Sequence, residues 1–526
     1  MIRGLVVGCV ALAACGGGPR VGARTAPISA TTTSFADNPL LAFAAADTAY
    51  AFATFQPLSL DAIHDLVVAS RATARRMPDV EGEAELHQIW VALTEEVGAF
   101  DAAHLQTIGV DATARLAIYA LGKYPVLRIE IASSERLLQY VQRVAARLAE
   151  PLPPPKLRAG YRYWTPGKAS SSVVPVIALG TRDVAIGFLP RATFDSALGE
   201  LLGERRPAKS LTGADFAALG KRDQFPDAGL GFVDVARVVA LALDDATLPP
   251  GCRPAIEALA HRVPRIAFGY ARLSQTRSSM GLVVELAPEL VAAGRTLATK
   301  LPGFKRIARE PAPFAFAAAF DLTKLAELGL RVASAASEIG AHCANSEIVD
   351  SARALATTIS APIPPVIAGF RGMIGAVDLV ERGPDGVTNI RGHGAVFGVA
   401  TNELVRLTGG GIPGLDPLSL TGKAHELPAR IIPYPGSFAA TGDAIAIALG
   451  PDSKELVETD LAGAAVAAPL AFLEYDMRRV ARLAFEPEIQ HRIEQAHELL
   501  ELAGLVRFEA SVEERGLVVQ LSFGGR

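Results

Sequence analysis

Residues Gly281-Leu282-Val283-Val284-Glu285-Leu286 recur almost unchanged as Gly516-Leu517-Val518-Val519-Gln520-Leu521. Each run follows another apolar stretch and a polar turn, at 266–273 and at 505–512. Short runs rich in β-branched residues and bounded by polar turns are typical of strands, so each copy predicts a β-hairpin. Because the same hairpin is written twice, we expect the body of the chain to be internally duplicated.

Other matches between the two parts of the chain occur in the same order. The clearest pairs VIALGTRDVAIGFLP with FAATGDAIAIALGP, and a helical pattern follows each of these strand pairs. The matched segments are 50–62 with 314–325, 176–190 with 438–451, 192–202 with 452–461, and 229–239 with 469–480. Chance similarity among hairpins rich in Ala, Val and Leu is the alternative, but the shared order favours duplication.

The first copy also predicts the fold class. Strand-like runs at 50–55, 115–121, 125–131 and 161–164 alternate with helical patterns that begin near Ser59 and that cover 83–100 and 134–150. With the helix at 83–100 counted as an addition, this is the ferredoxin-like βαββαβ order. We therefore predict an α+β fold of antiparallel sheets with helices packed on one face. The first half would span 41–302 and the second 303–526.

The N-terminus indicates export. Arg3 precedes a short apolar run, which is about half the length that a spanning helix needs, so a cleaved signal fits it better than an anchor or a buried helix. The run ends in Leu12-Ala13-Ala14-Cys15, which resembles the lipobox of bacterial lipoproteins. That resemblance implies a signal peptide and lipidation site at 1–15, with the lipid carried by Cys15.

The same resemblance implies a place in the cell. Residues 16–40 are mostly small or polar, which predicts a flexible linker between the lipid and the body. In lipoproteins of this kind, an aspartate after the cysteine favours the inner membrane, whereas this chain has Gly16. We expect a protein of the bacterial cell envelope, anchored in the outer membrane and facing the periplasm or the cell surface.

Composition excludes some classes of function. The chain has 526 residues, half of them hydrophobic, and a formal net charge of −4. Its length supports two or more cores, and no apolar stretch after Cys15 approaches spanning length. A weakly acidic balance argues against nucleic acid as a partner, because such binding requires concentrated positive charge.

Two cysteines remain in the body, Cys252 and Cys343. In an oxidising compartment an isolated pair is a candidate disulfide, and two unpaired buried thiols are the alternative. His342 adjoins Cys343, but neighbours in sequence do not face one another on a helix. The spacing of a zinc site is absent.

Signatures of catalysis are missing from the sequence. It contains no Gly-x-Ser-x-Gly elbow, His-Glu-x-x-His pair or phosphate-binding Gly-x-x-x-x-Gly-Lys-Ser/Thr loop. His491, Glu494 and Glu498 share one face of a predicted helix. An ordinary amphipathic helix has such a polar face in contact with solvent, so we favour this interpretation over a metal site. His393, within Arg391-Gly392-His393-Gly394, is interpreted as an ordinary strand histidine. We predict no catalytic residue, no metal ligand and no cofactor.

An aromatic and basic cluster is the remaining polar candidate. Tyr161, Tyr163 and Trp164 are interleaved with cations, and such rings can stack on sugars or bases. The cations are Arg158, Arg162 and Lys168. Successive strand residues point to opposite faces, so half of the cluster is expected in the core.

The body also resembles uncharacterised bacterial envelope proteins of unknown function. The resemblance rests on the Ala46-Asp47-Thr48 strand and on Leu211-Thr212 with Phe216 before a glycine-rich strand. It implies no catalytic residue.

We therefore expect a non-catalytic, membrane-tethered lipoprotein that binds a protein partner or an apolar ligand between its two related halves. The alternative is a hydrolase or metal-dependent enzyme whose site forms only in the fold. That alternative would be favoured if His393, His425 or His491 met carboxylates in a pocket.

Overall fold

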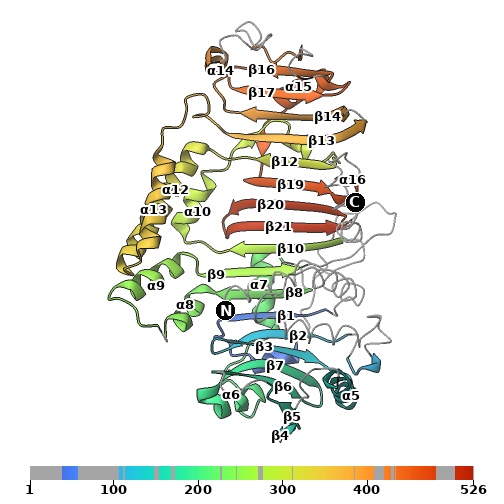
Figure 1. Ribbon diagram of the computed structural model, residues 1–526, viewed down its shortest axis with the longest axis vertical. Helices are drawn as coiled ribbons and strands as arrows, with labels where there is room; N and C mark the ends of the chain where they lie inside the picture. The colour runs from blue at the N-terminus through green and yellow to red at the C-terminus, as the bar shows by residue number, and fades with distance from the viewer. Residues whose placement is uncertain are drawn as a thin grey trace. The chain divides into compact units, whose positions relative to one another are not determined.

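In the computed structural model, part of the chain is described (Figure 1). The described residues are 38–56, 106–110, 113–146, 153–166, 172–225, 228–244, 246–270, 277–310, 312–383, 386–407, 420–427, 432, 434–480 and 504–524. Several predicted features lie outside them: the signal with Cys15, most of the linker at 16–40, the helices near Ser59 and at 83–100, Lys168, and the helix with His491, Glu494 and Glu498.

The chain divides into two compact units. The first unit contains the residues up to Ala246 together with Val263–Val283. The second contains Thr247–Arg262 and Val284–Gly524. In both, helices pack on antiparallel strands, so the predicted α+β class is confirmed. The predicted boundary after residue 302 concerns the two repeated halves of the sequence, and it stays a prediction.

The first unit is built on one antiparallel sheet, in the order β4-β5-β6-β7-β3-β2-β1-β8-β9-β10. Its strands are β1 (Tyr50–Thr54), β2 (Leu116–Leu121), β3 (Tyr124–Glu130), β4 (Lys156–Arg158), β5 (Tyr161–Trp164), β6 (Val173–Leu179), β7 (Asp183–Pro190), β8 (Gly229–Asp234), β9 (Arg265–Tyr270) and β10 (Arg277–Val284). The predicted hairpin at 176–190 is confirmed as β6 and β7.

The strand pairing differs from the ferredoxin-like βαββαβ plan, in which the first strand lies between the third and the fourth. Here β1 pairs with β2 and β8, and β3 pairs with β2 and β7. The β6–β7 hairpin arrives later in the chain and occupies the edge of β3 that the plan reserves for the first strand. Helical periodicity does not show which edge a later hairpin will occupy.

The helices of the first unit lie on both faces of its sheet, which corrects the expectation of one face. They are η1 (Pro39–Phe43), α5 (Ser134–Ala145), η2 (Arg191–Thr193), α6 (Phe194–Leu201), α7 (Gly213–Asp223) and α8 (Val235–Leu243). Leucines and a phenylalanine of η1, α6 and α7 pack on one face in the main core. Leu137 and Leu138 of α5 pack with Trp164 and Leu179 in a separate core. The second face is itself apolar at that end, so it can bury another helix.

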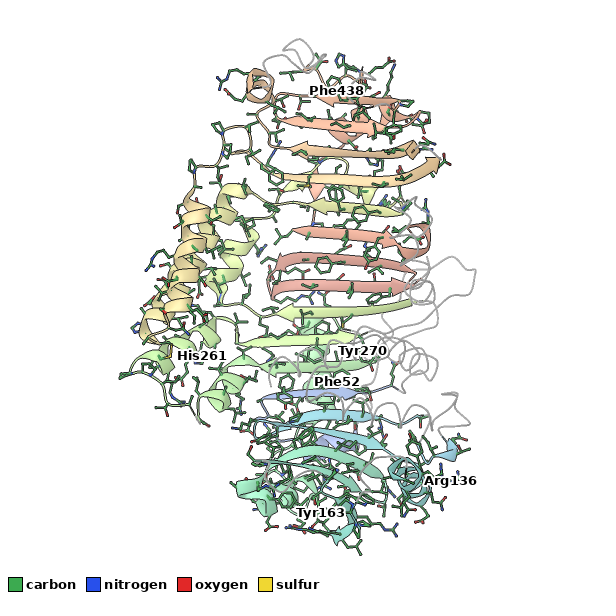
Figure 2. The ribbon with its side chains drawn as sticks, in the orientation of Figure 1. Phe52, Arg136, Tyr163, His261, Tyr270 and Phe438 are labelled. Atoms are coloured by element: carbon green, nitrogen blue, oxygen red, sulfur yellow. A yellow bond between two sulfur atoms is a disulfide. The ribbon has the colours of Figure 1, made fainter. Side chains whose placement is uncertain are left out.

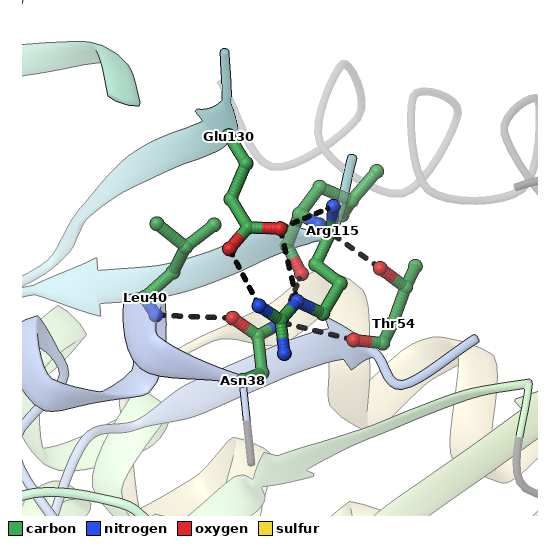
Figure 3. A network of polar contacts seen from close by, with 6 residues as sticks. Asn38, Leu40, Thr54, Arg115 and Glu130 are labelled. Carbon is green, nitrogen blue, oxygen red and sulfur yellow. Dashed lines mark hydrogen bonds and ion pairs between the residues drawn. The ribbon is translucent and has the colours of Figure 1, made fainter. Parts of the chain in front are cut away.

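A buried asparagine attaches η1 to this sheet (Figure 3). Asn38 Nδ2 donates to the carbonyl oxygens of Thr54 at 2.9 Å and Leu116 at 3.0 Å. Its Oδ1 accepts from the Leu40 amide at 3.0 Å, which caps η1. Beside it, Arg115 donates three hydrogen bonds to the carboxylate of Glu130, one from its backbone amide and two from its guanidinium. The carboxamide therefore joins β1, β2 and the first turn of the described chain.

The second unit is built on an antiparallel sheet in the order β15-β16-β17-β14-β13-β12-β19-β20-β21. Its strands are β12 (Phe314–Ala318), β13 (Gly372–Gly383), β14 (Gly386–Phe397), β15 (His425–Glu426), β16 (Gly436–Ala440), β17 (Ala444–Leu449), β19 (Ala471–Asp476), β20 (Leu505–Glu513) and β21 (Gly516–Gly524). A separate short ladder joins β11 (Lys300–Leu301) to β18 (Val466–Ala467). The hairpins predicted at 438–451 and 505–521 are confirmed.

The helices of the second unit are α9 (Cys252–Arg262), α10 (Pro288–Arg295), α11 (Phe304–Ile307), α12 (Leu322–His342), α13 (Ser346–Ser360), α14 (Thr401–Leu407), α15 (Ser453–Ala462) and α16 (Met477–Val480). Phe304 and Ile307 of α11 and Val457 of α15 pack in the core of this unit's sheet. Helices α12 and α13 form a hairpin, in which a Cβ on Gly329 would lie 2.7 Å from Ile359 Cδ1. Small residues therefore allow the two helices to approach closely.

Cys252, at the start of α9, and Cys343, after the end of α12, form a disulfide with a Cα–Cα distance of 4.4 Å. Helix α9 lies between β8 and β9 in sequence but belongs to the second unit. The chain therefore leaves the first unit after Ala246 and returns to it at Val263, and the disulfide attaches the intervening segment to the residue that follows α12. None of the helices in the described residues is long and apolar enough to cross a bilayer.

Candidate functional site

The most extensive candidate surface is the sheet face opposite the main core of each unit. In the first unit, a row of residues with matched register crosses this face from strand to strand. We name it the first central row: Phe268, Gly231, Phe52, Ile118, Leu127, Ile186 and Ile177. Every member is apolar or glycine, although surface strands usually alternate apolar and polar residues.

The second unit has a corresponding row on the corresponding strands. This second central row contains Phe508, Leu473, Phe316, Gly375, Gly394, Ile447 and Phe438. It too contains no polar side chain. An isoleucine stands at the same place in each row: Ile186 is 40% exposed and Ile447 is 43% exposed. Both rows therefore keep apolar side chains in contact with solvent.

Aromatic rings lie flat on glycines in both rows. A Cβ on Gly231 would lie 2.4 Å from the Phe268 ring, and one on Gly375 would lie 2.5 Å from Phe316 Cε1. The rings of Phe52 and Phe268 stack with centroids 5.8 Å apart. Figure 2 shows Phe52 of β1 and Tyr270 of β9, two strands of the first unit that are separated by β8. Rings that lie along a sheet make a smooth apolar surface, suited to contact with hydrocarbon rather than to polar recognition.

A second candidate is a buried ionic cluster in the second unit. His393 on β14 lies with Nδ1 2.8 Å from Asp460 Oδ2 on α15. Because a carboxylate only accepts, we assign Nδ1 as the donor of this bond, and Nδ1 then cannot also accept from Arg306 Nη2, which lies 3.1 Å away. Arg306 of α11 donates to the other oxygen of Asp460, and its Nε is buried without a hydrogen-bond partner among the described residues. The side chain of His393 is 6% exposed and that of Asp460 is fully buried.

This cluster has part of what acid–base chemistry requires. The carboxylate orients the imidazole, as in catalytic and metal-binding histidines, whose other nitrogen performs the chemistry. No hydrogen bond joins a serine, threonine or cysteine to His393 among the described residues. The described residues also contain no group of three or more metal-binding side chains. Its clearest role is to hold β14, α11 and α15 together.

The other predicted histidines are placed differently. His425 on β15 stacks with Phe438, with centroids 5.6 Å apart, and its Nε2 is buried without a hydrogen-bond partner in the described chain. No ion pair to a carboxylate accompanies it there. His491 lies outside the described residues. Only His393 of the three is seen to meet a carboxylate, and the cavity described below is lined by residues of the other unit.

A third cluster surrounds Arg128, whose side chain is fully buried in the first unit. Its guanidinium donates to Asp183, to the Leu201 carbonyl and, at 3.0 Å, to the Tyr119 hydroxyl. Tyr161 donates to Asp183 at 2.8 Å. Burial raises the pKa of the Tyr161 phenol to about 12, and the nearby charge of Asp183 acts in the same direction. The cluster joins β2, β3, β5, β7 and α6 in a network of satisfied polar groups.

The predicted aromatic cluster is part of this framework. Tyr161, Tyr163 and Trp164 are all buried. Arg158 forms an ion pair with Glu204, and Arg162 forms one with Glu135. The hydrogen bond from Arg158 lowers the pKa of the Glu204 carboxyl. The rings therefore pack inside the unit and present no stacking surface.

A cavity of about 290 Å³ lies in the first unit. Its lining includes Phe216, Leu219, Phe232, Asp234 and Arg237. Asp234 accepts from the Arg237 amide at 3.0 Å and caps α8, and the Arg237 guanidinium donates to the carbonyl of Asp47. Its volume is at the lower end for ligand sites, and these polar groups already bind one another.

Sequence reasoning missed the Arg128 network and the partners of His393. The signal for Arg128 was available, since it occupies an inward position of β3, two residues after the buried Val126. No sequence signal connects His393 with Asp460, which are 67 residues apart. Comparison with family models, with curated proteins and with solved structures finds no match to this chain.

Proposed function

We propose that the chain is a membrane-tethered lipoprotein of the bacterial cell envelope, lipidated at Cys15, which binds an apolar ligand or a protein partner and performs no catalysis. The observation that carries the binding role is the apolar, partly exposed central row on the sheet of each unit. Apolar surface in contact with water is costly, and a continuous patch of it marks an interaction surface. Binding between the two halves stays a prediction.

The proposed location rests on the lipobox and is supported by the disulfide. Disulfides persist in oxidising compartments such as the periplasm and are rare in the cytosol. Cys252 and Cys343 are joined, which suits export. Gly16 favours the outer membrane in this proposal.

We also propose that the two units arose by duplication. Both sheets follow one pairing order when β1, β2 and β3 are matched with β12, β13 and β14, β5 to β7 with β15 to β17, and β8 to β10 with β19 to β21. The strands β1 and β12 have the related sequences YAFAT and FAFAA. In both, aromatic residues occupy the open face and alanines the core. A common ancestor is the economical explanation for this shared order.

Purification from a bacterial envelope tests the function. Metabolic labelling with palmitate should mark the wild-type chain and spare Cys15→Ser, which serves as its matched control. The wild-type protein, extracted in mild detergent, should retain a defined apolar ligand detectable by native mass spectrometry, or one reproducible partner after crosslinking in cells. A labelled protein that repeatedly carries neither would refute the binding role, and an unlabelled wild-type chain would refute the tether.

The second candidate function is a hydrolase or metal-dependent enzyme, favoured by the His393–Asp460 pair. An imidazole oriented by a buried carboxylate is one component of such sites. The test is turnover of a panel of ester, amide and phosphate substrates, with and without added Zn²⁺. Turnover lost in His393→Gln but retained in His425→Gln would establish this alternative and exclude the non-catalytic role.

A further inference from the structure

Strand β14 carries a gap in the second central row. Gly392 and Gly394 both face the open side of the sheet, while His393 between them points toward the core and Asp460. Among the described residues, a Cβ on Gly394 would meet only the Ile374 carbonyl oxygen at 3.0 Å and Gly375 Cα at 3.7 Å. No side chain in the described part of the chain therefore lies within contact distance of this position. The atoms nearest to a Cβ on Gly392 also belong to the backbone.

Side chains stand on both sides of these glycines. Ile447 and Leu449 of β17 lie opposite Gly394 and Gly392. On the other side are Val377, opposite Gly392, and the ring of Phe316, which lies over Gly375. We name the floor formed by the two glycines, with these four side chains as walls, the β14 trough.

The first unit lacks this trough. At the positions that correspond to Gly375 and Gly394, the first central row has Ile118 and Leu127. Leu127 therefore fills the space that Gly394 leaves open in the second unit, and Ile118 occupies the place where the Phe316 ring covers Gly375. Ile186 and Ile447 remain equivalent in register and in exposure. The units thus provide one row with a trough and one without.

The trough offers only apolar contacts to a ligand. Strand β14 pairs with β13 on one side and β17 on the other, so its backbone groups are already used. A peptide cannot be added as a further strand, because that requires a free sheet edge. The walls carry no charge and no hydrogen-bonding group. A polar ligand would lose its hydration there without compensation.

The width of the β14 trough fits a single hydrocarbon chain. Strands β13 and β17 flank β14, and two strand spacings are about 10 Å. Carbon atoms in contact lie about 4 Å apart, so one file of methylene groups fits between the walls and two do not. We propose that the β14 trough binds a segment of a lipid acyl chain. This proposal rests on the proposed function and specifies its apolar ligand.

The test is titration with a spin-labelled stearic acid, using the full chain with Cys15→Ser so that no acyl chain of its own competes. Binding is measured from immobilisation of the nitroxide. Ile447→Asn removes one wall and should weaken binding about tenfold, which is what loss of roughly half a buried isoleucine contact gives. Ile447→Ala should give a smaller loss. The matched control Ile348→Asn, at an exposed isoleucine of α13 outside both rows, should leave the affinity unchanged.

The other outcomes are distinguishable. Equal losses in Ile447→Asn and Ile348→Asn, or no loss in either, would overturn the trough while leaving an apolar ligand in place. If the wild type does not bind the probe but forms a dimer in sedimentation velocity that Ile447→Asn abolishes, the occupant is a second copy and the acyl-chain proposal fails. Absence of both, together with absence of any bound partner, overturns the proposed function as well. Circular dichroism establishes that each variant is folded.

Discussion

Replacement of Arg128 by methionine should be among the most destabilising single changes in the first unit. Methionine keeps much of the side-chain volume but leaves the carboxylate of Asp183, whose side chain is 11% exposed, without its cation. Removing one partner of a buried ion pair costs about 3–5 kcal/mol, because the remaining charge stays buried. The lost hydrogen bonds to Tyr119 and Leu201 act in the same direction.

The assay is urea unfolding followed by tryptophan fluorescence. In a Trp90→Phe background, the emission comes from Trp164 alone, which is buried in the first unit. The matched control is Arg115→Met, because Arg115 forms its ion pair with Glu130 in a more exposed place and should cost about 1 kcal/mol. Adding Asp183→Asn to Arg128→Met should restore part of the loss. Equal losses for Arg128→Met and Arg115→Met would refute the reasoning.

Three further predictions concern stability. Cys252→Ala combined with Cys343→Ala should lower the free energy of unfolding by about 4–5 kcal/mol, since the disulfide spans 91 residues. The reduced wild-type protein should match this double variant in urea unfolding, and a wild type whose stability does not change with reductant would contradict the prediction. Asn38→Ala should cost about 2–3 kcal/mol, because two carbonyls lose their donor, and should lower the thermal midpoint more than exposed Asn389→Ala does. Folding raises the Tyr161 pKa from 10.0 to about 12, so the stability that its neutral form contributes is complete below pH 10 and is lost as the pH rises toward 12. The wild type should therefore lose more free energy of unfolding between pH 10 and 12 than Tyr161→Phe does, and parallel plots of unfolding free energy against pH would contradict the assignment.

Local elements of the fold were predictable from the sequence, because short-range periodicity determines them. The hairpin of β16 and β17 follows from alternation around Thr441-Gly442-Asp443, and the matched hairpin of β6 and β7 follows from the same pattern. The common order of the matched segments in the two halves was also predictable, because it is found by comparing the sequence with itself and requires no knowledge of three-dimensional contacts.

Long-range pairing was not predictable in the same way. β3 pairs with β7 across an intervening helix and hairpin, and β14 pairs with β17 in the same manner. These contacts depend on which exposed edge a later hairpin meets, and the residues of one strand do not encode that choice. The ferredoxin-like expectation therefore differs from the observed sheet at β1 and β3.

The candidate site was predictable only in part. From the sequence alone, His393 is the candidate residue of the motif Gly392-His393-Gly394. The proposal rests instead on the two glycines, whose neighbours on β13 and β17 follow only from the strand register. Similarly, Ile447 is an ordinary strand residue in the sequence. Only the register of β14 and β17 places Ile447 beside Gly394.

The hydrogen bonds of Asn38 determine how the first unit would respond to a pulling force applied to the chain before this residue. The carboxamide holds the end of β1 and the beginning of β2 together, so tension that arrives there is shared by two strands at once. A load carried by β1 alone could detach that strand from its neighbours one residue at a time. We expect an attachment shared between β1 and β2 to resist such stepwise detachment better than an attachment to β1 alone.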